Sequence, residues 1–99
     1  MPNRTYHKLV RDRIPEIIEA DGKTCVTEIL ADEQYLEMLD AKLNEELAEY
    51  QESKSLEEVA DLLEIMRAVV KARGRTWKQL EQVRADKAAR WGAFGKNCC

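Results

Sequence analysis

The fold of this chain is decided by residues 43–62, which read LNEELAEYQESKSLEEVADL. Apolar residues recur at steps of three and four on both sides of a short polar break at residues 52–55, which predicts two helices folded back on each other. Four acids stand in mirror positions around that break: Glu46, Glu49, Glu58 and Asp61. Folding back would bring the outer two level with each other and the inner two level with each other. The i, i+3 spacing within each helix also places both of its acids on one face.

These four acids are predicted to form a metal site. Converging carboxylates in a partly buried groove repel one another unless a positive charge lies between them. Oxygen ligands select hard cations, so we expect Mg²⁺ at this site, with Mn²⁺ as a substitute. Glu45 is a candidate fifth member that could polarise a water molecule, although a solvated side chain explains this residue equally well.

The helical faces argue against four ordinary surface acids. Glu46 lies between Leu43 and Tyr50 and interrupts an apolar stripe, while Glu58 falls on the apolar side of its own helix. A buried carboxylate must be protonated, paired with a base or bound to a cation. The nearest bases on these helices are not expected on that face: Lys42, Lys54, Arg67 and Lys71. Two alternatives stay open, because single helical acids usually face solvent and Glu58 could be the capping-box partner of Ser55.

The whole chain is predicted to be one all-α domain over residues 1–99, a helical bundle built around the central antiparallel hairpin. Four helices are expected, over residues 14–20, from the N-cap Asp32 to about residue 52, from the N-cap Ser55 to about residue 73, and from the N-cap Thr76 to about residue 90. Gly74 is a fitting C-terminal residue for the third of these helices. Residues 1–13 form a short basic N-terminal segment, residues 24–30 a connector, and residues 92–99 a C-terminal tail.

Length and composition narrow the class of protein. With 99 residues, 44% hydrophobic and 35% charged, the chain suits a helical globular domain that leaves much apolar area uncovered, so a homo-oligomer is expected, either dimer or tetramer. No apolar run approaches the ~20 residues of a membrane span, and no secretory signal is recognised, which favours a cytoplasmic location. Cys25, Cys98 and Cys99 form neither a disulfide framework nor a zinc spacing.

Several catalytic chemistries are excluded by the residue inventory. The single histidine, His7, is far from the helices, which argues against a di-iron carboxylate centre and against a Ser-His-Asp or Cys-His arrangement. The chain has no glycine-rich phosphate loop. No interleaved basic and aromatic pattern marks a nucleic-acid polymer as the partner.

Charge is strongly segregated along the chain. Residues 45–64 carry eight acids and one base, whereas residues 71–96 carry eight bases and two acids. An acidic centre between basic ends is what a metal–phosphate ligand requires, although most of these charges are solvated helix faces. The candidate phosphate-binding bases are Lys8, Arg11, Arg13, Lys87 and Arg90.

A family resemblance agrees with this interpretation. Residues 45–49 (Glu-Glu-Leu-Ala-Glu), followed by residues 58–61 (Glu-Val-Ala-Asp), resemble the all-α nucleoside triphosphate pyrophosphohydrolase superfamily. The opening residues 6–15, Tyr-His-Lys-Leu-Val-Arg-Asp-Arg-Ile-Pro, look like a MazG-like branch of it that often carries a phosphoribosyl-ATP pyrophosphohydrolase-like label.

The resemblance implies a magnesium-dependent hydrolase that cleaves the α–β phosphate linkage of a nucleotide and releases pyrophosphate. It implies metal ligation by Glu46, Glu49, Glu58 and Asp61, with Glu45 and Glu46 in catalytic roles. Two other functions stay open: a non-catalytic helical dimerisation or adaptor module, whose acids face a basic partner, and a dedicated phosphoribosyl-ATP pyrophosphohydrolase.

Overall fold

The computed structural model describes residues 9–25 and 31–96, and within them the chain is all-helical, as predicted. Its helices are α1 (Ile14–Ala20), α2 (Asp32–Ser53), α3 (Leu56–Ala72) and α4 (Trp77–Trp91). No strand occurs in these two ranges. The predictions for Lys8, for most of the connector and for the terminal cysteines lie outside the described residues.

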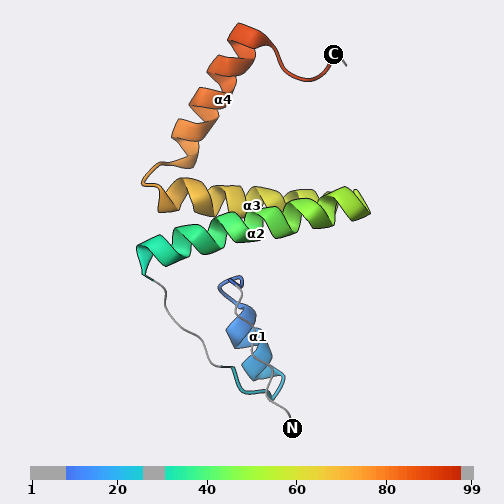
Figure 1. The fold of residues 1–99 in the computed structure, drawn as a ribbon, viewed down its shortest axis with the longest axis vertical. Coiled ribbons are helices and arrows are strands. Elements are labelled where there is room, and N and C mark those ends of the chain that lie inside the picture. The colour runs from blue at the N-terminus through green and yellow to red at the C-terminus, as the bar shows by residue number, and fades with distance from the viewer. Residues whose placement is uncertain (1–8, 26–30, 97–99) are drawn as a thin grey trace.

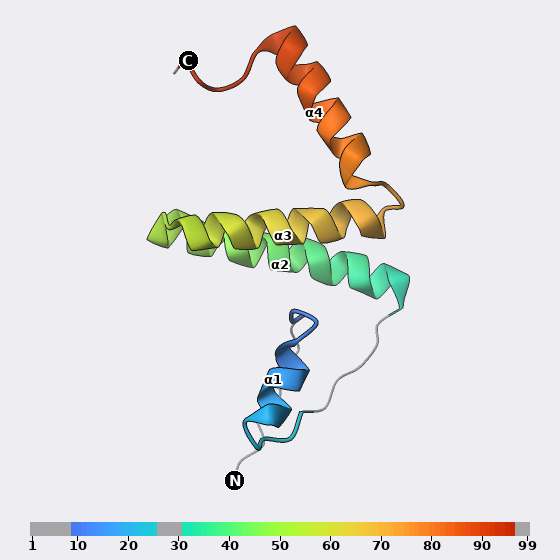
Figure 2. The same ribbon diagram turned by 180° about the vertical axis from the view of Figure 1, so that it is seen from behind.

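Helices α2 and α3 lie side by side along their length and are joined by only two residues (Figure 1). The same pairing is visible from behind in Figure 2. Lys54 makes the reversal with a left-handed backbone (φ 58°), and its N–H donates to the Tyr50 carbonyl at 2.7 Å. Its ammonium also lies 5.4 Å from the centre of the Tyr50 ring. A connection this short keeps the neighbouring turns of α2 and α3 in contact.

One predicted helix cap and one half of a predicted capping box differ in the structure. The α2 N-cap is Ala31 rather than Asp32, which is instead the first helical residue. An acid in the first helical turn still interacts favourably with the helix dipole. At the start of α3, Ser55 caps as predicted, because its hydroxyl accepts from the Glu58 N–H at 3.3 Å. The reciprocal half of the capping box is wrong: the Ser55 N–H donates to Ser53 Oγ at 3.3 Å, which leaves the Glu58 carboxylate available for other contacts.

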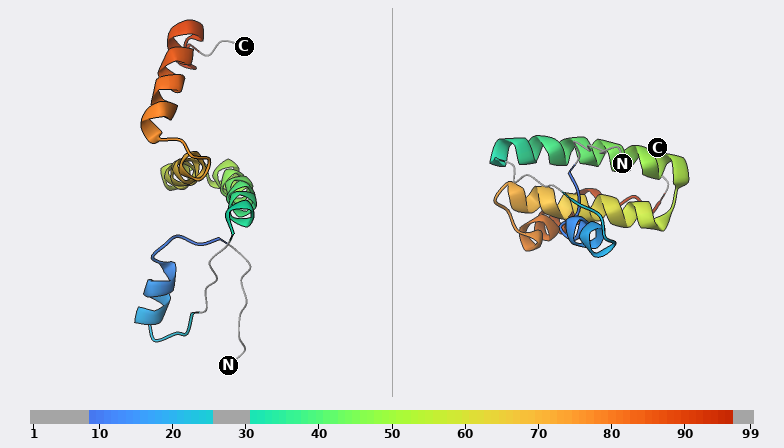
Figure 3. Two further views of the ribbon diagram at one scale, coloured as in Figure 1. Left: turned by 90° about the vertical axis from the view of Figure 1, so that its left-hand side faces the viewer. Right: turned by 90° about the horizontal axis from the view of Figure 1, so that it is seen from below.

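The end of α3 and the start of α4 follow the sequence prediction. Gly74 has a φ of 76°, and the N–H of Arg75 reaches back to the Val70 carbonyl at 3.0 Å, so the last carbonyls of α3 are satisfied. Thr76 and Gln79 then exchange both bonds of a capping box, at 2.9 and 3.1 Å. From this turn α4 projects away from the α2–α3 pair, as the side view in Figure 3 shows.

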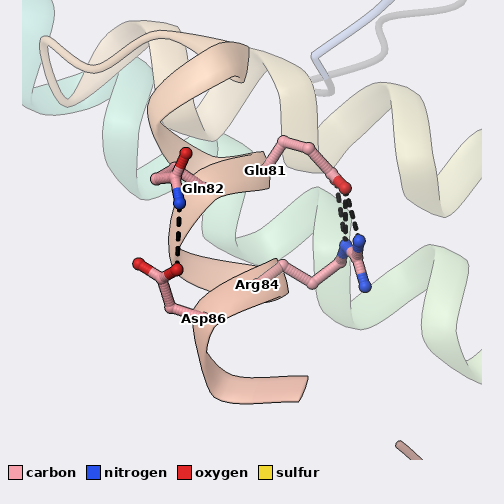
Figure 4. Close-up of polar contacts among 4 residues, drawn as sticks. All are labelled: Glu81, Gln82, Arg84 and Asp86. Atoms are coloured by element: carbon pink, nitrogen blue, oxygen red, sulfur yellow. Dashed lines mark hydrogen bonds and ion pairs between the residues drawn. The ribbon is translucent and has the colours of Figure 1, made fainter. Parts of the chain in front are cut away.

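Polar side chains stabilise α4 largely within the helix itself (Figure 4). Arg84 donates to the Glu81 carboxylate one turn earlier, and Gln82 donates to Asp86 at 2.9 Å. The hydrogen bonds from Arg84 lower the pKa of Glu81, and the same carboxylate raises the pKa of the guanidinium. Such i, i+3 and i, i+4 pairs support a helix that has few tertiary contacts.

The hydrophobic core of the described residues is small. Leu39 of α2, which is 2% exposed, is the one buried apolar residue there. Among the described helices, α1 packs against none of the others, and α4 touches α3 alone. The radius of gyration is 17.2 Å, whereas a compact domain of this length has about 13 Å. None of the described helices is both long and apolar enough to cross a membrane.

Candidate metal centre

The α2–α3 pair brings together three of the four acids that the sequence placed in mirror positions. Glu46 of α2 and Glu58 and Asp61 of α3 each offer a carboxylate oxygen, and these oxygens lie within 4.8 Å of one another. Glu46 also belongs to a second such group, with Glu45 and Glu49. We call these five residues the acidic cluster, and Glu46 is its centre because it belongs to both groups.

Glu46 is the buried member of the acidic cluster. The residue is only 7% exposed, and its Oε2 is buried without a hydrogen-bond partner. Glu58 has the same defect, because its own Oε2 is also buried and unpartnered. Buried carboxylate oxygens without partners lose hydration and gain nothing in return, so they are rare in folded proteins. Two of them in one cluster are oxygens that a further positive group could satisfy.

Lys42 corrects the prediction that no helical base reaches this face. Its ammonium lies 3.4 Å from Glu46 Oε1 and 3.6 Å from Glu45 Oε2, and its side chain is only a quarter exposed. The physical reason is the i, i+4 spacing from Lys42 to Glu46, which puts the two side chains on one face of α2. This ion pair satisfies one oxygen of Glu46 and leaves the other unpartnered. The spacing itself was the signal that would have revealed Lys42.

The other three bases of that prediction lie elsewhere. Lys54 stacks on Tyr50 at the reversal, and the guanidinium of Arg67 lies 5.4 Å from the centre of the Trp77 ring. Lys71 is exposed near the end of α3. Lys42 is therefore the α2–α3 base that enters the acidic cluster among the described residues.

Arg11 reaches the acidic cluster from the N-terminal segment. One of its terminal nitrogens lies 2.6 Å from Asp61 Oδ1, fifty residues away in the sequence. A turn before α1, closed by the Ile14 N–H donating to the Arg11 carbonyl at 3.0 Å, sets the position of the Arg11 backbone. The sequence predicts that Arg11 is a phosphate-binding base, but it does not predict the pairing of Arg11 with Asp61.

Mutual repulsion and burial raise the pKa of two members of the acidic cluster, Glu58 and Glu49. Burial is the main cause of the raised pKa of Glu58, and the nearby Glu46, Glu49 and Asp61 raise it further. The pKa of Glu49 is raised chiefly by the direct approach of the Glu46 carboxyl group and by its negative charge, against the lowering effect of Lys42. Each shift means that the folded protein resists one more negative charge here. A bound cation would relieve that resistance.

The other predicted phosphate-binding bases within the described residues are not gathered at the acidic cluster. Arg13 is exposed and pairs with Glu16, with 3.3 Å between Nε and Oε2. Lys87 and Arg90 are exposed residues of the distal part of α4, which points away from the α2–α3 pair (Figure 1). The Arg90 guanidinium lies 5.6 Å from the centre of the Trp91 ring.

The donor set fits a hard divalent cation. Every candidate ligand is a carboxylate oxygen, and Mg²⁺ and Mn²⁺ prefer such oxygens, usually retaining several waters. Carboxylate oxygens within 4.8 Å of one another can share one ion, since each metal–oxygen distance is about 2.0–2.2 Å and the ligands lie on different sides of it. The unpartnered oxygens of Glu46 and Glu58 are the ones with free lone pairs for that role.

Comparisons with known proteins leave the family open. No family model matches the chain, and no solved structure matches it. An uncharacterized protein of Mycolicibacterium smegmatis (strain ATCC 700084 / mc(2)155) is 60% identical over 42 residues. Those residues are 42% of this chain and 43% of that protein, so the matched part spans less than half of either.

Proposed function

We propose that this chain is a magnesium-dependent nucleotide pyrophosphohydrolase that cleaves the α–β phosphate linkage of a nucleoside triphosphate or a related nucleotide. The observation that carries the proposal is the buried, unpartnered Oε2 of Glu46 beside the equally unpartnered Oε2 of Glu58, within a carboxylate cluster. The resemblance of residues 45–49 and 58–61 to the all-α nucleoside triphosphate pyrophosphohydrolases supports the choice of reaction.

Each group of the acidic cluster has a role in this proposal. Glu46, Glu49, Glu58 and Asp61 would hold the cation, and Glu45 would accept a proton from the attacking water. When bound, Mg²⁺ would neutralise the polyphosphate and lower the pKa of a bound water. Phosphoryl transfer asks a protein mainly for positioning and for electrostatic stabilisation, so a site without His, Ser or Cys is sufficient. Arg11, adjacent to Asp61, is the described base best placed to contact a phosphate.

An adaptor function is less well supported. Acids that bind a basic partner protein must be accessible to it, whereas Glu46 is 7% exposed and its unpartnered oxygen is buried. A small cation can reach such an oxygen, and a lysine or arginine from a partner surface has much more difficulty.

The proposal is tested by a screen of nucleotides for pyrophosphate release in the presence of Mg²⁺ or Mn²⁺. The panel should contain the common ribo- and deoxyribonucleoside triphosphates together with phosphoribosyl-ATP, because this compound separates the dedicated role from the general one. We expect at least one substrate, with activity abolished by Glu46→Gln and by Asp61→Asn in variants that retain the helical circular-dichroism spectrum.

Matched controls are available on the same two helices. Glu37 of α2 and Glu64 of α3 are exposed acids outside the acidic cluster. Glu37→Gln and Glu64→Gln should therefore retain activity. Full activity of Glu46→Gln, or equal losses in the controls, would contradict the assignment of the site.

We also propose that the α2–α3 hairpin works within a homo-oligomer, a dimer or a tetramer. One face of α3 carries exposed apolar residues at steps of three and four, which we call the apolar stripe: Leu56, Val59, Leu63 and Met66. This spacing is that of a helix–helix seam. Val70 continues the stripe into an open pocket of about 380 Å³ between α3 and α4, where Leu80 and Val83 also lie.

A second copy of the chain is the best-supported occupant of the apolar stripe. The chain exposes 9271 Å², about 1.6 times the ~5,800 Å² of a compact monomer of 11.4 kDa. The excess is greater than the ~800 Å² that each partner buries in a standard interface. A domain whose described core is one buried leucine needs a partner that is always present, and another copy of the chain is always produced with it.

A further inference from the structure

Arg11 stands out because it connects two parts of the molecule that otherwise do not pack together. Among the described residues, α1 makes no packing contact with another helix, yet Arg11, just before α1, contacts Asp61 of α3 at 2.6 Å. Both side chains are partly exposed, at 59% for Arg11 and 38% for Asp61. Exposed pairs of this kind are weak, so the guanidinium can leave Asp61 at little cost.

The position of Arg11 places it in competition with a cation. Asp61 forms a group with Glu46 and Glu58, and the carboxylate oxygens of these three residues lie within 4.8 Å of one another. A cation bound by these oxygens would take up the charge of Asp61 and repel the guanidinium beside it. The released guanidinium would start out beside the cation, because in the free protein it lies 2.6 Å from Asp61 Oδ1.

Phosphate is the natural second partner for a released arginine. The planar guanidinium presents paired N–H donors that match the oxygens of a phosphate as well as those of a carboxylate. A polyphosphate bound to the cation would bring its oxygens close to Asp61, within the reach of Arg11. Lys42, by contrast, lies on α2 and pairs with Glu45 and Glu46 on the same helix.

We infer that Arg11 exchanges partners, from Asp61 in the free protein to a phosphate of the ligand once the cation is bound, so that the cation and the polyphosphate reinforce each other's binding. The inference rests on the proposed metal site. It makes Arg11 a residue that opposes binding of the bare cation and favours binding of the cation together with phosphate. A purely structural ion pair would not change the two affinities in opposite directions.

The experiment measures two dissociation constants by isothermal titration calorimetry: that of Mn²⁺ alone, and that of the magnesium complex of inorganic tripolyphosphate, which carries phosphates and no base. For Arg11→Ala, we expect Mn²⁺ to bind about two- to five-fold more tightly, the range expected for removing an exposed ion pair. We expect the tripolyphosphate complex to bind roughly 10–100-fold more weakly, as for the loss of a charge-assisted phosphate contact.

Arg13→Ala is the matched control. It removes the same charge two residues away, from a side chain that pairs locally with Glu16, and should change both constants less than two-fold. Changes of the same sign in Arg11→Ala, or no change in either constant, would overturn the exchange while leaving the metal site intact. If the wild-type protein binds no Mn²⁺, this result contradicts both the metal site and the exchange of partners by Arg11.

Discussion

Two sides of α3 show opposite chemistry, and each is incomplete in its own way. Asp61, on one side, belongs to the acidic cluster, whereas Leu63, two residues later and about 200° around the helix, belongs to the apolar stripe. The acidic cluster buries charge without enough partners, and the apolar stripe exposes carbon without cover. The two proposals therefore give one helix two separate tasks, holding a cation on one side and binding a second chain on the other.

The largest effect is expected from breaking the apolar stripe. Leu63→Glu should convert the oligomer to monomers and lower the melting temperature by more than about 10 °C, because burying a leucine contributes about 1.5–3 kcal/mol in each copy. Sedimentation velocity and circular dichroism measure the two effects. If this variant does not fold, the milder Leu63→Ala should show a weakened oligomer. The control Glu64→Gln, at an adjacent exposed position, should leave assembly unchanged. A monomeric, stable wild-type protein would contradict the proposed homo-oligomer.

Mutation of the acidic cluster should raise the stability of the metal-free protein, whereas mutation of the apolar stripe should lower stability. Glu58→Gln is expected to weaken Mn²⁺ binding at least 10–100-fold, because even residues that only support a metal ligand cost that much when they are removed. It should nevertheless raise the melting temperature of the metal-free protein, since it removes one of several carboxylates that repel one another. Calorimetric titration and thermal melts check both parts. A lower melting temperature without metal would show that Glu58 is a structural residue.

The same cluster predicts a pH dependence that the apolar stripe does not share. The pKa of Glu58 is raised above its usual value of 4.5 by burial and by neighbouring acids. The unfolded chain then loses its proton first as the pH rises past 4.5, so this group makes the folded state progressively less stable up to its own raised pKa. We expect metal-free wild type to lose stability relative to Glu58→Gln as the pH rises from about 4.5 to the raised pKa of Glu58. Saturating Mg²⁺ should remove that difference, and parallel curves would contradict the prediction.

The smallest effect is expected at Lys42. Its ammonium partly neutralises Glu45 and Glu46, so it competes with a bound cation for the negative charge of the same carboxylates. Lys42→Gln should tighten Mn²⁺ binding about two- to five-fold in a titration, the range for a weak ion pair. Weaker binding in this variant would mean that Lys42 positions Glu46 for the cation and does not compete with it.

The sequence predicted those features that depend on local spacing. Helix bounds, the Ser55 and Thr76 caps and the glycine that follows α3 all rest on residues within one turn of each other, and the structure agrees. The convergence of Glu46, Glu58 and Asp61 could also be predicted from the sequence. A connection of two residues leaves one simple way for α2 and α3 to pair side by side.

Other features depend on competition or on distant contacts, and these were missed. Glu58 was expected to bond to the Ser55 N–H, but Ser53 Oγ takes that donor. The pairing of Arg11 with Asp61 spans fifty residues, and no periodicity encodes it. Lys42 was a different kind of miss, because its i, i+4 spacing from Glu46 was present in the sequence and was outweighed by the expectation of an apolar face.

The most direct test of the proposed metal site is a titration of Mn²⁺ into wild type and Glu46→Gln, in which electron paramagnetic resonance measures the free ion. We predict saturable binding to wild type and a loss of at least 100-fold in affinity for Glu46→Gln, with Glu37→Gln behaving like wild type. Equal binding by wild type and Glu46→Gln would show that the buried carboxylate of Glu46 does not hold the cation.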